Sequence, residues 1–149
     1  IMADITVGSS WLSRTSFAEP ALLAGLAQLE ELDLIELELD DLQGLTGLEH
    51  LQQLDLQDCR IKDYTALEQL SGLVWLNLSG TSFSDTGLLS GMKDMETLIL
   101  CGSQVRDLTP LLQLKHLQLL DISGLEIRHD QTYKELSDRL GDGLYEETQ

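Results

Sequence analysis

Several features are scarce in this sequence, and each absence excludes a class of protein. No apolar run approaches the roughly 18 residues that a helix needs to cross a bilayer. The first residues, Ile1-Met-Ala-Asp-Ile-Thr-Val, lack the basic and then apolar order of a secretory signal. A secreted protein whose signal had been removed, or a fragment of a longer chain, would have the same start.

Basic residues are also few, because 9 Lys and Arg face 26 Asp and Glu, for a net charge of −17. Nucleic-acid affinity comes largely from basic side chains that neutralise phosphates, so the charge predicts no nucleic-acid partner. It equally predicts no binding to an anionic membrane. It favours another protein with a basic surface, although acidity also serves solubility alone.

Cysteine occurs twice, at Cys59 and Cys101. The repeat described below puts these residues two coils apart, which is roughly 10 Å at about 4.8 Å per strand. That separation exceeds the roughly 7 Å limit between the Cα atoms of a disulfide. Two thiols that do not pair favour a reducing compartment, so the sequence predicts a cytoplasmic protein, with secretion left open.

The sequence is rich in a repeat of 22 residues. The first of its leucine columns is Leu32, Leu54, Leu76, Leu98 and Leu120. The second is Leu34, Leu56, Leu78, Leu100 and Ile122. A period of about 20–29 residues with L-x-x-L-x-L is typical of leucine-rich repeats. It predicts an α/β fold, a right-handed leucine-rich repeat solenoid with a parallel concave β-sheet and short 3₁₀ or α segments on the convex side.

The repeat assigns the whole chain, 1–149, to one leucine-rich repeat domain with coils over about 7–127. Strands are expected near 30–35, 52–57, 74–79, 96–101 and 118–123. Extending the frame backwards places Leu12 in the second leucine column, so Ser10, Trp11 and Leu12 form a degraded first strand. An amphipathic pattern over about 130–140 predicts a C-terminal capping helix. Leu144 returns to the second column 22 residues after Ile122 and predicts a vestigial strand.

The motif Leu48-x-x-Leu51-x-x-Leu54-x-Leu56-x-x-Cys59-x-Ile61-x-Asp63 resembles leucine-rich repeat proteins of the 22-residue type, as in the internalins and SDS22-like proteins. The resemblance implies protein–protein binding through the concave sheet. The family's usual turn asparagine is replaced here by Thr15, Leu37, Cys59, Thr81, Ser103 and Leu125. Leucine cannot form hydrogen bonds, so the turns at Leu37 and Leu125 are expected to deviate.

A column of acids follows each turn: Glu19, Asp41, Asp63, Asp85 and Asp107. A carboxylate at the start of a helical turn can accept hydrogen bonds from unpaired backbone N–H groups, which is a structural role. We find no phosphate-binding glycine motif and no metal-ligand cluster. His50 and His116 share a column but lie three coils apart, roughly 14 Å. The sequence therefore predicts no enzyme, no catalytic residues, no cofactor and no metal.

The candidate binding residues are those that alternate with the inward leucines and so face the concave surface. The predicted partner-binding set is Trp75, Ile99, Leu119, Asn77, Asp55, Asp121 and Trp11. Trp75 is the strongest candidate, because an aromatic ring among apolar neighbours and acids is typical of an interface hot spot. Packing against neighbouring strands without a ligand remains the alternative.

Three functions fit these observations. The first is a protein–protein interaction module that binds a protein or peptide across the concave sheet. The second is an acidic, immunity-type stoichiometric inhibitor of a basic enzyme. The third is a regulatory leucine-rich repeat fragment of a larger signalling protein.

Overall fold

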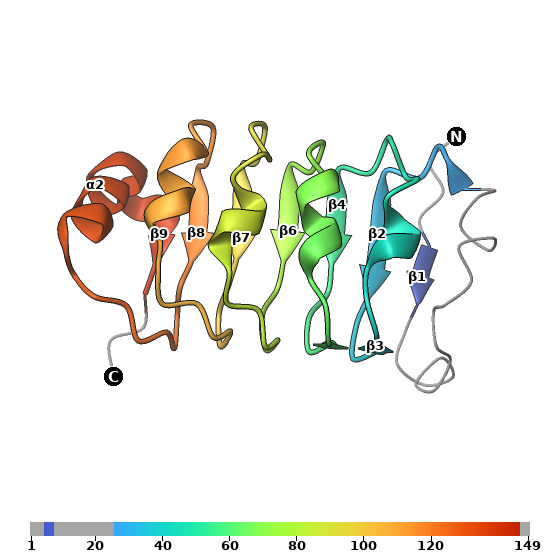
Figure 1. The fold of residues 1–149 in the computed structure, drawn as a ribbon. Coiled ribbons are helices and arrows are strands. Elements are labelled where there is room, and N and C mark those ends of the chain that lie inside the picture. The colour runs from blue at the N-terminus through green and yellow to red at the C-terminus, as the bar shows by residue number, and fades with distance from the viewer. Residues whose placement is uncertain (1–4, 8–25, 147–149) are drawn as a thin grey trace.

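The repeat folds into a row of parallel strands with short helical segments packed along one side (Figure 1). The structure is a computed structural model that describes residues 5–7 and 26–146. The strands of the main sheet are β1 (Ile5–Val7), β2 (Glu31–Leu34), β4 (Gln53–Asp55), β6 (Trp75–Asn77), β7 (Thr97–Ile99), β8 (Leu119–Asp121) and β9 (Leu144–Tyr145). A two-stranded sheet of β3 (Glu38–Leu39) and β5 (Arg60–Ile61) lies at the edge where the chain turns.

The main sheet is parallel throughout, and its neighbours follow the order of the chain. From β2 to β8 every residue pairs with the residue 22 positions later, as in Leu32 with Leu54 and Leu76 with Leu98. The five central strands lie where the sequence predicted them.

The return path of each coil holds a short helix. These are the 3₁₀ helices η2 (Gln43–Leu45), η3 (Thr65–Gln69), η4 (Thr86–Leu89) and η5 (Thr109–Gln113). A coil of 22 residues leaves no room for a longer helix beside a strand and two turns. The chain then forms the α-helix α2 (Gln131–Leu140) and the 3₁₀ helix η6 (Gly141–Gly143). The capping helix was therefore predicted correctly.

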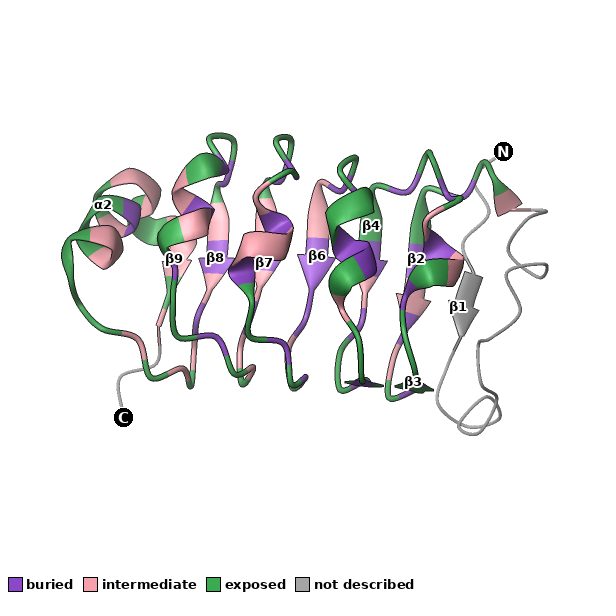
Figure 2. Ribbon diagram, in the orientation of Figure 1, coloured by how far each residue is buried: buried purple, intermediate pink, exposed green. Residues whose placement is uncertain are grey.

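The core is the layer between the sheet and these helices (Figure 2). Both leucine columns face it, and Leu54, Leu76, Leu98 and Leu120 are each 0% exposed. Leu136 of α2 is also fully buried, and the Arg139 guanidinium donates hydrogen bonds to the carbonyls of Leu112 and Leu114 at the end of η5. These contacts join the capping helix to the last coil.

The predicted acid column binds the backbone at the start of each return helix, and Asp85 is the N-cap residue of η4. One carboxylate oxygen of each aspartate accepts a hydrogen bond from the backbone N–H two residues later, at 2.8 Å for Asp41, Asp63 and Asp107 and 3.0 Å for Asp85. Hydrogen bonds from Thr65 lower the pKa of Asp63, and hydrogen bonds from Thr109 lower the pKa of Asp107, because both favour the charged form. Glu19 lies outside the described residues.

The turns after the strands share a left-handed residue that the sequence analysis missed. Its column is Glu36, Asp58, Gly80, Gly102 and Gly124, with φ between +56° and +74°. The next residue closes the turn, and Leu125 N–H donates to Ile122 C=O at 3.1 Å just as Cys59 N–H donates to Leu56 C=O. Leu37 likewise follows a left-handed residue, Glu36. The expected deviation at Leu125 was therefore wrong, because the backbone conformation shapes that turn without an amide. The turn at Leu37 does deviate, since the chain forms a bend at Glu36 in place of the hydrogen-bonded turn of the four later coils.

The two ends of the sheet depart from the 22-residue step. Ile5 of β1 pairs with Leu32, and Val7 pairs with Leu34, across 27 residues. The sequence did not predict β1, and the first strand that it predicted at Ser10–Leu12 lies outside the described residues. At the other end Leu144 pairs with Leu120 and not with Ile122, because α2 and η6 lengthen the last coil to 24 residues. Trp11 and Thr15 lie outside the described residues.

The left-handed turns can be tested at Gly102. An added Cβ there would meet nothing closer than 3.8 Å, so Gly102→Ala introduces backbone strain without a clash. We expect a loss of about 1–2 kcal/mol in the free energy of unfolding, measured by denaturant titration. Gly91→Ala is the control, because that glycine has open space and no positive φ. An equal effect of the two substitutions would contradict the role of the left-handed turn.

Candidate functional site

The face of the sheet away from the helices is built from side chains that alternate with the buried leucines. We name it the open face; it is the concave face of the sequence prediction. Its first row is Glu31, Gln53, Trp75, Thr97 and Leu119. Its second row is Asp33, Asp55, Asn77, Ile99, Asp121 and Tyr145. Partners in a parallel pair point to the same side of a sheet, so each row forms a ladder across the solenoid.

Four apolar side chains gather on the C-terminal half of this face, and we name them the apolar patch: Trp75, Ile99, Leu119 and Tyr145. They come from four successive strands, β6 to β9. Trp75, Ile99 and Leu119 are partly buried, and Tyr145 is 50% exposed. A shallow hollow of about 220 Å³ lies beside Trp75, lined by Gln52, Gln53, Val74, Trp75, Glu96 and Thr97. The patch therefore offers both a flat apolar surface and a small recess.

The polar residues of the second row have a structural role in addition to their position on the face. Asp55, Asn77 and Asp121 each accept a hydrogen bond from the backbone N–H two residues later, at 2.9–3.0 Å. These bonds close the chain at the end of each strand. Asn77 also donates its amide to Asp55 at 3.3 Å. Asp55 and Asp121 remain partly accessible.

Asn77 is the one predicted contact residue in the described chain that the structure buries. Its exposed fraction is 6%, and its side-chain oxygen accepts hydrogen bonds from both the N–H and the hydroxyl of Ser79. The side chain holds neighbouring strands together and leaves little surface for a partner. The role that the structure shows for Asn77 is structural, and its place among the partner-binding residues stays a prediction.

Tyr145 is the functional candidate that the sequence analysis missed. It reaches the second row because β9 pairs Tyr145 with Asp121, whereas a strict 22-residue step leaves Tyr145 out of that row. The close approach of this strand requires glycine at position 143, since an added Cβ would lie 1.9 Å from the carbonyl oxygen of Gln118. An aromatic residue shortly after the Gly141 and Gly143 pair was the only sequence signal available.

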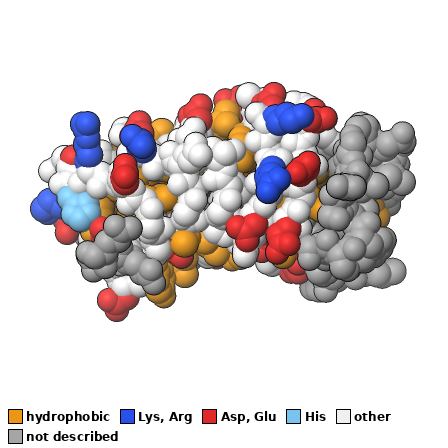
Figure 3. All heavy atoms as spheres, turned by 90° about the horizontal axis from the view of Figure 1, so that it is seen from below, with side chains coloured by type: hydrophobic (Ala, Val, Ile, Leu, Met, Phe, Trp, Pro, Cys, Tyr) orange, Lys and Arg blue, Asp and Glu red, His pale blue; other side chains and the backbone are white. Residues whose placement is uncertain are grey.

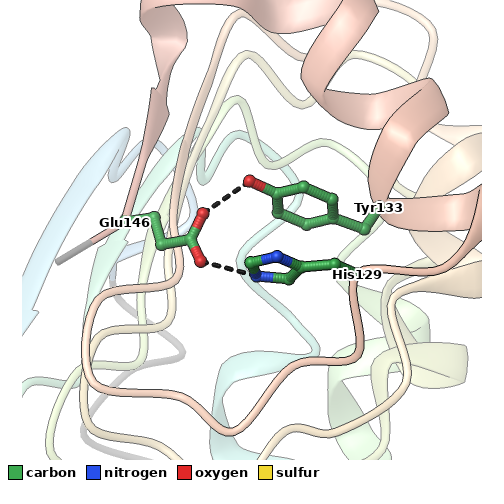
Figure 4. Close-up of polar contacts among 3 residues, drawn as sticks. All are labelled: His129, Tyr133 and Glu146. Carbon is green, nitrogen blue, oxygen red and sulfur yellow. Dashed lines mark hydrogen bonds and ion pairs between the residues drawn. The ribbon is translucent and has the colours of Figure 1, made fainter. Parts of the chain in front are cut away.

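The strand that carries Tyr145 is fastened by the three side chains of Figure 4. Glu146 accepts hydrogen bonds from Tyr133 of α2 and from His129 in the loop before that helix, the latter at 2.8 Å. The rings of His129 and Tyr133 stack with their centroids 4.1 Å apart. One carboxylate therefore joins β9, α2 and the preceding loop.

The pKa values of this cluster follow from its hydrogen bonds. The bond from Tyr133 and the contact with His129 lower the pKa of Glu146, against a smaller opposing effect of burial. The same bond to Glu146 raises the pKa of Tyr133, because the neighbouring carboxylate opposes a phenolate. The cluster is most favourable with Glu146 charged and Tyr133 protonated.

A hollow of about 800 Å³ lies away from the open face. It follows the edge with β3 and β5, where the ion pairs Arg60–Glu38 and Lys62–Asp40 stand beside small residues such as Gly80 and Gly102. Figure 3 shows basic side chains lying beside acidic ones on this edge. The hollow contains Cys59, but burial raises the pKa of that thiol to about 11. It is protonated at neutral pH and is no nucleophile.

Other kinds of site were sought in the same part of the chain. No three His, Cys, Asp or Glu side chains of residues 5–7 and 26–146 are placed to hold a metal ion. His50 and His116 are exposed, and His116 lies 3.7 Å from Asp94. Cys59 and Cys101 remain thiols. None of the helices described is long and apolar enough to cross a membrane.

Comparison with known structures identifies the architecture. Internalin C2 of Listeria monocytogenes superposes with a TM-score of 0.74 and 23% identity, over 88% of this chain and 57% of that one. The plant peptide hormone receptor RGFR1, in complex with RGF2, gives 0.62 and 24% over 86% and 23%. TLR13 in its complex with ssRNA13 gives 0.65 and 19% over 83% and 22%. No family model and no curated protein matches the sequence.

These similarities establish a leucine-rich repeat fold. The chain spans little more than half the length of internalin C2 and less than a quarter of each receptor. What those longer proteins bind is therefore a property of those proteins.

The division between core and open face can be tested on two adjacent residues of β6. Leu76→Ala should lower the free energy of unfolding by about 2–5 kcal/mol, because a fully buried side chain leaves a cavity. Trp75→Ala should cost about 1 kcal/mol, since the ring is only partly covered. Thermal melting of the two variants beside the parent measures both. Equal losses would place Trp75 in the core.

The Glu146 cluster predicts that the stability of the fold depends on pH in the acidic range. The folded-state pKa of Glu146 lies below its ordinary value of 4.5, so its contribution is present above that pH and is lost as pH falls through the lowered pKa. Glu146→Gln removes the charge, so it should melt below the parent at neutral pH and converge with it in acid. Glu135→Gln, on an exposed residue of α2, is the control and should match the parent at neutral pH. A gap that persists in acid would contradict the charged cluster.

Proposed function

We propose that this leucine-rich repeat protein is a protein–protein interaction module that binds a protein or peptide partner across its open face. The observation that supports the proposal best is the apolar patch, in which Trp75, Ile99, Leu119 and Tyr145 lie on four adjacent strands of one face. Partly exposed aromatic residues in such a patch are typical of interface hot spots. The buried leucine ladder holds them in fixed positions, so little order has to be gained on binding.

The proposal excludes nucleic acid as the partner of this face. The strands and the turns that follow them, residues 30–36, 52–58, 74–80, 96–102, 118–124 and 144–146, contain no Lys or Arg. They contain nine acids: Glu30, Glu31, Asp33, Glu36, Asp55, Asp58, Glu96, Asp121 and Glu146. Such a surface repels phosphates, and the same argument applies to anionic membranes. The RNA complex of TLR13 concerns a protein of 19% identity.

The protein has a binding role and no catalytic role in this proposal. An active site needs nucleophiles, bases and charge-stabilising groups that converge on one point. The open face presents ladders of side chains, and the protonated Cys59 thiol lies on the turn edge instead. A cytoplasmic location suits a chain whose two cysteines remain thiols.

A second candidate, an acidic stoichiometric inhibitor of a basic enzyme, is favoured by the nine acids of the strands and the turns that follow them. Such an inhibitor would use the same surface, so the two functions differ in the partner and not in the site. Loss of a partner's enzymatic activity at a one-to-one ratio would favour the inhibitor.

The test is selection of binders from a library of short random peptides displayed on phage, followed by affinity measurements with purified variants. Trp75→Ala should weaken the selected peptides by about 2 kcal/mol or more, roughly thirtyfold. Leu88→Ala is the matched control, because it removes a partly buried apolar side chain from η4 on the helical side. Peptides that bind both variants like the parent, or that lose affinity only for Leu88→Ala, would contradict the proposal.

A further inference from the structure

We infer that the partner of the open face is a basic, extended polypeptide segment that crosses the strands, with Lys or Arg over β2 and β4 and a large apolar side chain on the apolar patch. This inference rests on the proposed function and names the chemistry of its partner. It is carried by the division of the open face into two halves and by the spacing between them.

The two halves differ in chemistry. The outward residues of β2 and β4 include Glu31, Asp33 and Asp55, whereas Trp75, Ile99, Leu119 and Tyr145 come from β6 to β9. Asp121 is the acid of the second row within the apolar half. A surface lined by charges of one sign concentrates ligands of the opposite sign and speeds their encounter. A segment that is basic at one end and apolar at the other matches this order.

Four basic residues of the described chain are paired with acids outside the open face. Arg60 and Lys62 are on the turn edge, where Arg60 lies 2.9 Å from Glu38 and Lys62 pairs with Asp40. Arg106 pairs with Glu126 at 3.5 Å, and Lys134 pairs with Asp138 within α2. These cations are therefore engaged with acids outside the open face, and the acids of the open face have no Lys or Arg in their own strands.

Strand spacing gives the register of the partner. β2, β4, β6 and β7 are successive neighbours, so Asp33 and Ile99 are three strand spacings apart in one row, about 14 Å. An extended chain advances about 3.3–3.6 Å per residue and therefore covers this distance in about four residues. Side chains four positions apart in an extended segment point to the same side. The expected pattern is a basic residue and an apolar residue separated by four positions.

The acids can be neutralised while keeping their bonds to the backbone and to Gln53. Asp55 accepts hydrogen bonds from Gln57 N–H at 2.9 Å and from the Asn77 amide at 3.3 Å. Asn77 accepts the bond equivalent to the first from Ser79 N–H one strand later, so an asparagine at position 55 keeps that bond and loses the longer one. Asparagine therefore fits this position. Glu31 accepts a hydrogen bond from the Gln53 amide at 2.8 Å, which a glutamine oxygen can also accept. Glu31→Gln with Asp55→Asn thus changes the charge of the open face while keeping these acceptors.

The experiment uses peptides selected on the parent protein and sequenced, and measures their affinity by titration calorimetry. Recovered peptides should be enriched in Lys or Arg four positions from a large apolar residue. The double variant Glu31→Gln/Asp55→Asn should bind them about threefold to tenfold more weakly at low salt, as expected for the loss of two exposed ion pairs. High salt should abolish the difference, because it screens exposed charges.

The matched control is Glu49→Gln/Glu68→Gln, which makes the same change in net charge on exposed residues between the strands. It should bind like the parent. Two results would overturn this inference and leave the proposed function standing. In the first, the selected peptides need Trp75 but contain no basic residues. In the second, both double variants weaken peptide affinity equally. Peptides indifferent to Trp75→Ala would overturn the proposed function. A short single-stranded RNA that competes with the peptides and loses binding in Trp75→Ala would overturn both.

Discussion

The structure depends on burial of the leucine ladder between the sheet and the short helices. A coil has no core of its own, and its leucines are buried only because the neighbouring coil covers them. Leu54, Leu76, Leu98 and Leu120 are fully buried in register, which fixes each strand against the next. A shift of one residue would exchange the buried and the outward side chains of a strand. The positions of Trp75 and Ile99 on the open face are thus consequences of the leucines beside them.

Backbone conformation in the turns is the second constraint, and it acts together with the ladder. The chain leaves each strand through a left-handed residue, and glycine supplies it after β6, β7 and β8. Glu36 and Asp58 take the same conformation at the two acidic coils. Polar residues of the second row, such as Asp55 and Asn77, then bond the backbone just beyond the strand. Part of the polarity of the open face therefore has a structural origin.

Sequence alone predicted the middle of the solenoid, because one period governs residues 31–121 and inward leucines mark every strand. It missed β1 at one end and the register of β9 at the other, where that period breaks, although it predicted α2 and a strand at Leu144. The 27-residue step to β1 has no leucine signal, and the 24-residue step to β9 depends on how α2 and η6 fill the last coil. Tyr145 was missed for this reason. Burial of Asn77 was missed because alternation gives the direction of a side chain but not its hydrogen bonds to Asp55 and Ser79.

The C-terminal strand β9, whose register the 22-residue period did not predict, also completes the candidate site. Glu146 links β9 to α2 and to His129, and the contact of Gly143 with Gln118 lets the strand approach β8. The cap that protects the last leucines from water therefore also places Tyr145 beside Asp121 on the open face. A terminal cap has to cover the core, and Tyr145 does not serve that purpose because its side chain points outward and is 50% exposed. For this reason we count β9 as part of the candidate binding surface as well as part of the cap.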